Sequence, residues 1–423
     1  MGSVVEINPL TRVEGHGSVK VYREGSRVER VDLCLTESPR LFEALLIGKS
    51  YAEVPEIICR ICSLCSTVHK VTALLAVEDA FQVEVSEVTA LTRELMVQGG
   101  QIQDHALHLY CLLLPDLLGV RGVGELALKA PELLKTGLAM RKAGNMIQET
   151  VGGRIIHPVN IIPGGLGRRI GKEQLLLLRS ELEAILPSCK EAFRLFRTPF
   201  PFPELPKPHC MALAPSAAVP AARRLVFCDG HSFPVSDYRD EICEEVIPHS
   251  HAKRARVLGA DPTVGALARL TLQPCPAAGA DEMLRSAREE IIGKDIRGNN
   301  VAQAIELWQA VARALELIDR LVELGAKGGG NVKILPRRGR GSAACEAPRG
   351  VLIHSYDFDQ EGICTGADVI TPTSLNQGAL ARDLLALGRG MDAEDDLRLT
   401  TAMERLVRCY DPCISCSVHL LRL

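Results

Sequence analysis

The chain lacks the features that mark nucleic-acid-binding and membrane-spanning proteins. No run of Lys and Arg residues occurs in its 423 residues, and the formal net charge is −3. A basic stripe is the electrostatic signature of a nucleic-acid interface, so no nucleic-acid partner is expected. The apolar run LYCLLLPDLLGV is shorter than the roughly 18 residues that a membrane-spanning helix needs, and it is interrupted by Pro115. No membrane span is therefore predicted.

Targeting segments and repeats are also missing. The first residues, MGSVVEINPL, carry neither a basic region nor an apolar core, so no secretory signal is predicted. We find no internal repeat and no low-complexity tract. These absences predict a cytoplasmic globular protein, in which cysteines stay reduced or bind metals.

What is present predicts an α+β fold that is mostly helical. Hydrophobic residues make up 47% of the chain, enough for a large core. Short β-like runs predict an N-terminal antiparallel sheet within residues 1–36. Apolar residues at three-to-four spacing predict a central helical bundle that includes residues 172–196, residues 299–327 and a long helix at 88–114 weakened by Gly99 and Gly100. A peripheral β insertion is expected at about 200–280, and loops with short elements in the last hundred residues.

Two Cys-x-x-Cys pairs stand out among the 15 cysteines. Cys62 and Cys65 lie near the N-terminus, and Cys413 and Cys416 repeat the spacing near the C-terminus. Two thiolates at this spacing can reach one ion, so each pair is half of a four-thiolate site. The ends must then meet, which favours one domain over residues 1–423 instead of the two to three that length alone predicts.

The nature of the metal stays open at this point. Thiolates select zinc, copper(I), nickel or iron. Zinc ribbons also use two such pairs, but with only about 15–20 residues between them. A zinc-tetrathiolate structural protein therefore remains an alternative, although four thiolates held by distant segments suit a reactive metal better.

The sequence also resembles a known family. RICSLCSTVH and DPCISCSVH resemble the two end motifs of nickel–iron hydrogenase large subunits, and NPLTRVEGHG, QDHALHLY and APRG are similar to further motifs, in order along the chain. The resemblance is closest to cytoplasmic members linked to nicotinamide, deazaflavin, ferredoxin or a heterodisulfide reductase. It implies reversible heterolytic cleavage of H2 at a Ni-Fe(CO)(CN)2 centre. Nickel would be bound by the four cysteines, with Cys65 and Cys416 bridging to iron.

The resemblance implies roles for residues outside the pairs as well. Arg349 would compensate the negative charge of the buried centre, oriented by Asp104 and Asp411. Glu14 would relay protons. The remaining implied contacts are a hydrogen bond from Thr373 to a cyanide, and a second metal, Mg2+ or Fe2+, bound by Glu43 and His419.

Electrons must leave through other proteins. The chain has no spare cysteine pattern for an iron–sulfur cluster, so an iron–sulfur small subunit is predicted, with further flavin or iron–sulfur subunits. A second alternative is the related nickel-free quinone-site subunit of respiratory complex I. That scaffold lacks the four cysteines, which favours the enzyme.

Overall fold

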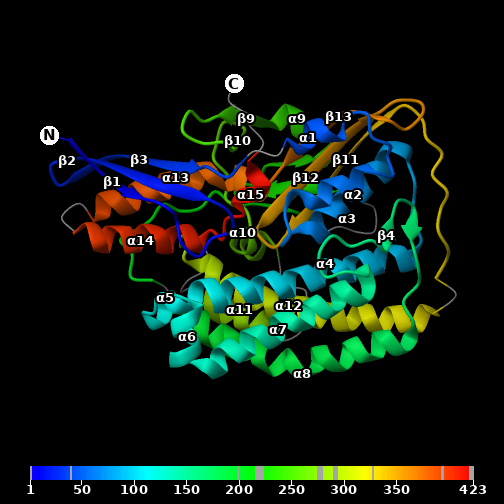
Figure 1. Ribbon diagram of the computed structural model, residues 1–423, viewed down its shortest axis with the longest axis horizontal. Coiled ribbons are helices and arrows are strands. Elements are labelled where there is room, and N and C mark those ends of the chain that lie inside the picture. Colours follow the sequence, from blue (N-terminus) through cyan, green and yellow to red (C-terminus); the bar gives the residue numbers. More distant parts are fainter. Residues whose placement is uncertain are drawn as a thin grey trace.

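Three antiparallel strands begin the chain in the computed structural model, which describes residues 2–38, 41–198, 200–214, 223–273, 280–288, 294–325, 328–391 and 395–418. Strands β1 (Gly2–Ile7), β2 (Gly17–Glu24) and β3 (Arg27–Leu35) pair in that order (Figure 1). Val19 and Val21 of β2 are fully buried, which fits strands with alternating faces. The predicted N-terminal sheet is confirmed.

Four long helices form the bundle along the lower side of Figure 1. They are α4 (Glu87–Leu107), α7 (Pro131–Gly152), α8 (Lys172–Phe196) and α12 (Gly298–Leu324). Helix α4 packs against α7 and α12, and α8 packs against the same two helices. The central helical bundle is therefore confirmed.

Helix α4 is continuous through its two glycines, so the predicted weakening there is wrong. A Cβ on Gly99 would lie 2.8 Å from Ile147 Cγ2, and a Cβ on Gly144 would lie 2.6 Å from the backbone O of Gly99. These glycines let α4 and α7 cross with their backbones close together. The helix continues as a π-helical turn, η2 (His108–Leu113), and then as α5 (Leu114–Leu118).

A second antiparallel sheet lies above the bundle. Its strands are β11 (Gly339–Ala347), β12 (Gly350–Phe358) and β13 (Cys364–Ile370), and helix α3 (Ser66–Phe81) packs against β11 and β12. Helices α13 (Pro372–Gly390) and α14 (Asp396–Cys409) follow. The expectation of loops and short elements in this region is wrong. The strands are buried on both faces and lack clear alternation, and TPTS is the start of a helix capped by Thr371, not a turn.

The predicted β insertion forms two small sheets. Strands β6 (Met211–Leu213), β7 (Arg224–Phe227) and β8 (Ser232–Pro234) make one, and β9 (Ile242–Val246) and β10 (Lys253–Val257) make the other. Their apolar side chains form a separate cluster with Val351 and Ile353, on the face of β12 that points away from α3.

Short elements complete the fold: α1 (Phe42–Leu46), α2 (Val54–Ile58), η1 (Cys59–Ile61), α6 (Val123–Lys129), β4 (Ile161–Ile162), β5 (Gly165–Leu166), η4 (Val235–Asp237), α9 (Tyr238–Glu241), α10 (Ala266–Leu272), α11 (Ala280–Arg288) and α15 (Ile414–Ser417). Among the described residues, no helix is both long enough and apolar enough to cross a membrane.

Candidate metal centre

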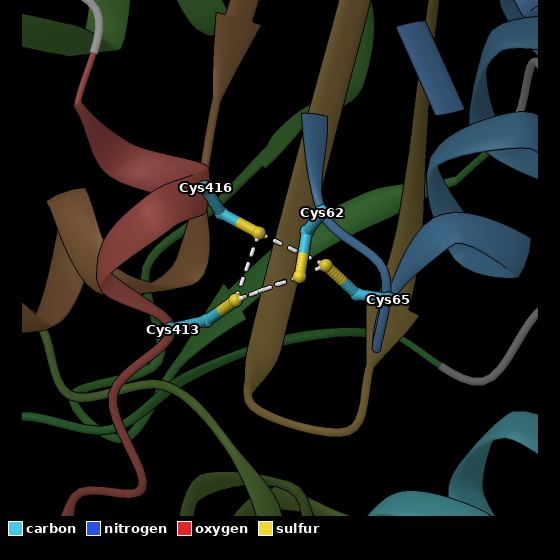
Figure 2. A group of neighbouring side chains, drawn as sticks. All are labelled: Cys62, Cys65, Cys413 and Cys416. Carbon is cyan, nitrogen blue, oxygen red and sulfur yellow. Dashed lines mark hydrogen bonds between the residues drawn. The ribbon is translucent and has the colours of Figure 1, made fainter. Parts of the chain in front are cut away.

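The two cysteine pairs meet in the interior, as predicted. Cys62 and Cys65 lie between η1 and α3, while Cys413 and Cys416 lie at the start of α15 and within it. All four sulfurs point toward one another in Figure 2. The Sγ–Sγ distances are 2.8 Å for Cys413–Cys416, 2.9 Å for Cys65–Cys416 and 3.4 Å for Cys62–Cys413. The four sulfurs lie within 4.8 Å of one another, and every one of these residues is buried.

The N-terminal motif holds the C-terminal pair in place. Glu14 and Cys413 form a backbone bridge, and the backbone O of Glu14 accepts a hydrogen bond from Ile414 N at 3.1 Å. The Glu14 carboxylate accepts a hydrogen bond from Ser415 N at 3.1 Å and another from the Ser415 hydroxyl. Gly15 has a φ of +85°, and a Cβ there would lie 2.8 Å from Ile414 Cβ. The close approach of the two segments therefore requires glycine at this position.

A buried set of charges fixes the same contact from farther away. Asp116 Oδ1 lies 2.6 Å from Arg12 Nη2, and Asp116 Oδ2 lies 2.6 Å from Arg408 Nε. Arg408 also donates to the backbone O of Thr11 at 2.8 Å. One carboxylate thus joins the N-terminal motif to the helix that leads into the second cysteine pair.

The sulfurs compete for protons because they are buried together. Burial raises the pKa of Cys65 to about 11, and it also raises the pKa of Cys416. Hydrogen bonds from Cys413, Cys416 and Cys65 lower the pKa of Cys62, so this sulfur is the one that ionises most readily. Four thiolates at this separation need cations in place of the protons, and soft divalent metals supply them. The donor set therefore fits a thiolate-bound metal centre.

Arg349 is held between two carboxylates beside the sulfurs. It lies in the turn between β11 and β12, is 4% exposed, and lines a small cavity together with Cys65, Cys413 and Cys416. Its Nη1 donates to Asp104 Oδ2 at 2.6 Å, and its Nε donates to Asp411 Oδ1 at 3.3 Å. Nη2 lies 3.2 Å from Asp411 Oδ1 but is buried without a hydrogen bond of good geometry. A buried cation with a spare donor beside four thiols suits an anionic metal centre.

Comparison with known proteins identifies the family. The profile described as "Nickel-dependent hydrogenase" matches residues 40–160, and one described as "HoxL-like" matches residues 4–37. The alpha subunit of sulfhydrogenase 2 from Pyrococcus furiosus is 34% identical, over 99% of this chain and 100% of its own length. The chain belongs to the nickel-dependent hydrogenases.

Other members of the nickel-dependent hydrogenases support this assignment. One chain of the F420-non-reducing hydrogenase vhu from Methanococcus voltae is 31% identical, over 89% of this chain and 96% of its own length. A solved NAD+-reducing [NiFe]-hydrogenase superimposes with a TM-score of 0.87 at 25% identity, with 99% of each chain covered. The chain is therefore the catalytic large subunit of a nickel–iron hydrogenase. The nickel-free scaffold and the zinc-tetrathiolate protein are not supported.

The remaining predicted residues of this hydrogenase chain lie close to the cluster or in α1. Thr373, in the first turn of α13, accepts a hydrogen bond from Cys413 N at 2.9 Å. Glu43, in α1, accepts one from Val369 N at 2.9 Å. Burial raises the pKa of Glu43, and Lys253 opposes this effect. His419 lies outside the described residues, so the structure does not place it beside Glu43.

Sequence reasoning missed two groups that the structure adds to the site. His69 lines the cavity beside Cys65 and Cys416, and its Nδ1 lies 3.0 Å from Nε2 of His354 on β12. Ser415 donates twice to Glu14. A polar His354 within the apolar run GVLIHSY was a detectable signal, because a histidine in a buried strand needs a partner.

Proposed function

We propose that this chain cleaves H2 reversibly into protons and electrons at the cluster of Cys62, Cys65, Cys413 and Cys416. One observation carries the proposal: four buried sulfurs within 4.8 Å of one another share a cavity with Arg349. The Ni-Fe(CO)(CN)2 centre, when bound, would supply the heterolytic splitting of hydrogen. The protein would supply the thiolate ligands, the compensating charge and the path for protons.

Arg349 would act as the fixed positive charge at the centre. Asp104 and Asp411 hold two edges of the guanidinium, which leaves Nη2 to donate to an anionic ligand. The pKa of Asp411 is lowered in spite of its burial, first by Arg349 and then by His108, so this carboxylate stays charged. Thr373 would donate its hydroxyl hydrogen to a cyanide, because its oxygen already accepts from the backbone of Cys413.

Glu14 would carry protons between the cluster and the rest of the protein. Burial raises the pKa of its carboxyl group, and a hydrogen bond involving the Cys413 side chain connects it to the sulfurs. A carboxyl group that contacts a thiol and has a raised pKa is suited to both accepting and releasing a proton near neutral pH.

A second metal site would lie at Glu43. We propose that its carboxylate binds Mg2+ or Fe2+ together with His419. Support comes from the chemistry of the carboxylate, an oxygen ligand that suits these hard cations. Glu43 is also partly buried, and its pKa is raised by burial and by the negative charges of Asp368 and Glu244, an environment that a bound cation would relieve.

Electrons would pass to an iron–sulfur small subunit, then through further flavin or iron–sulfur subunits to a soluble acceptor in the cytoplasm. Within the described residues, the only group of three or more His, Cys, Asp or Glu side chains that could bind a metal is the four-cysteine cluster. The described part of the chain therefore offers electrons no second metal centre of its own.

Metal analysis and infrared spectroscopy of the purified complex test the proposal. We expect about one nickel per chain, with absorption bands of CO and cyanide. Cys62→Ala should abolish both hydrogen oxidation and the bands, since nickel loses a thiolate. Cys59→Ala is the matched control, because Cys59 is buried three residues away and its sulfur contacts the backbone of Glu56. A protein that contains only zinc and shows no such bands would rule the proposal out.

A further inference from the structure

A chain of three buried side chains leads from the metal cavity into the protein. His69 of α3 lines the cavity, and its Nδ1 lies 3.0 Å from Nε2 of His354. On the far side of His354, Nδ1 lies 2.7 Å from the hydroxyl oxygen of Tyr356. All three residues are at most 1% exposed. The chain lies where α3 packs on β12, and neither the cysteine ligands nor the groups around Arg349 form part of it.

The order of the hydrogen atoms along this chain follows from Tyr356. A buried hydroxyl group must place its hydrogen on an acceptor. In the part of the chain that the structure describes, His354 is the only hydrogen-bond partner of the Tyr356 hydroxyl. Tyr356 therefore donates to His354 Nδ1. The phenol keeps its hydrogen, because burial raises the pKa of Tyr356 well above its ordinary value.

This direction passes from one imidazole to the next. A neutral imidazole carries one N–H, so His354, which accepts at Nδ1, donates at Nε2. His69 then accepts at Nδ1 and carries its own N–H at Nε2. Packing holds the rings in this arrangement: the ring centroids of His354 and Tyr356 are 5.8 Å apart at an interplanar angle of 82°.

We propose that Tyr356 is a positioning residue that, through His354, fixes His69 as a hydrogen-bond donor at the wall of the thiolate cavity. A donor at this wall withdraws electron density from a thiolate and so tunes the metal bound to it. The effect on the metal rests on the function proposed above, whereas the order of hydrogen atoms does not.

Nitrogen NMR of the metal-free full chain, labelled with 15N-histidine, tests the order of hydrogen atoms. We expect the wild type to show His69 and His354 protonated at Nε2, with assignments from His69→Gln and His354→Gln. In Tyr356→Phe, which keeps the ring and removes only the hydroxyl, both tautomers of the pair should be populated. A wild-type His69 protonated at Nδ1 would overturn the proposal, and this measurement requires no folded variant.

Infrared spectroscopy of the assembled enzyme tests the effect on the metal. In Tyr356→Phe the CO and cyanide bands should shift while nickel content stays unchanged, and turnover should fall by about 10- to 100-fold, as for other partners of metal ligands. Tyr238→Phe is the control, because it loses a hydrogen bond to Asp368, at 2.6 Å, away from the histidine pair. Bands in Tyr356→Phe at the wild-type positions would overturn the tuning role. Absence of bands from the wild type would instead reject the hydrogenase function and leave the NMR result standing.

Discussion

Single side chains determine how charge is balanced at the centre. Arg349 donates to Asp104 and Asp411 through different nitrogens, so both the position and the orientation of its planar group are fixed. An ammonium group can balance charge, but it cannot make a forked contact of this kind. The geometry, and not the charge alone, is what the two carboxylates preserve.

Arg349→Lys should therefore keep the metals and lose most of the turnover. Loss of a positioned donor of this kind typically costs about 10²–10³ in rate. Hydrogen oxidation is measured in the assembled complex, with nickel content as the check on assembly. A rate equal to that of the wild type would mean that Arg349 is only structural.

Glu14→Gln should separate metal binding from proton transfer. Glutamine keeps the size of the side chain and an acceptor for Ser415 N, but it cannot take up a proton. Nickel content and infrared bands should match those of the wild type, while hydrogen oxidation and evolution should fall together by about 10²–10⁴. Glu14→Asp, one methylene shorter, should give intermediate rates in the same dye-linked assay. If Glu14→Gln retains the wild-type rates, the proton path must lie elsewhere.

At the level of elements, close helix packing supports the site. Asp104 lies on α4, and the crossing of α4 with α7 at Gly99 and Gly144 fixes where that helix lies. Residues of α12 also bind the site, because Gln303 donates to Asp411 Oδ2 at 2.9 Å. The bundle therefore positions the carboxylates that orient Arg349.

Gly144→Ala should destabilise the protein through this crossing. The new Cβ would lie 2.6 Å from the backbone N of Gln103 and 2.6 Å from the backbone O of Gly99, and neither atom can move freely. Overpacking of this kind costs about 1–3 kcal/mol. Gly100→Ala, on the same pair of helices, meets nothing within 4 Å and should be neutral or stabilising by up to about 1 kcal/mol. Urea unfolding of both variants gives the comparison, and equal stabilities would contradict the close crossing.

Sequence patterns predicted the elements that form locally and missed those that depend on distant contacts. Periodicity was sufficient for α8 and α12, and equal Cys-x-x-Cys spacing was sufficient for the meeting of the two ends. The strands β11 and β12 were missed because both faces are buried, which removes the alternation that marks a strand. The partners of Asp116 and Tyr356 lie in other elements or on one face of a missed strand, so no local pattern reveals them.

Across the whole molecule, one carboxylate ties the two ends of the chain together. Asp116 pairs with Arg12 and Arg408 and has 4% of its side chain exposed. The two arginines come from opposite ends of the sequence, and each would be left as a buried charge without this partner. Removing one member of such a group is strongly unfavourable.

Asp116→Asn should lower the free energy of unfolding by about 3–5 kcal/mol. The variant should also bind less nickel, because the two cysteine pairs lose the contact that aligns them. Asp396→Asn is the control. Asp396 pairs with Arg23, but 67% of its side chain is exposed, so little change is expected. Thermal unfolding and metal analysis give the comparison, and a stable Asp116→Asn with full nickel would show that the cysteine motifs align without it.

The proposed partner gives a further test at this scale. The large subunit expressed without other hydrogenase subunits should not reduce a dye with hydrogen, because its described residues offer electrons no second metal centre. Addition of the iron–sulfur small subunit should restore the reaction. Full activity from the isolated chain would contradict the proposed route for electrons.

The distance in sequence between the two cysteine pairs has a consequence for biosynthesis. A ribosome completes Cys62 and Cys65 early and Cys413 and Cys416 only near the end of translation. A nascent chain, or one that stops before residue 413, can offer a metal only half of the sulfurs. Assembly of the metal centre must therefore follow synthesis, and prematurely terminated chains cannot form a complete four-sulfur site.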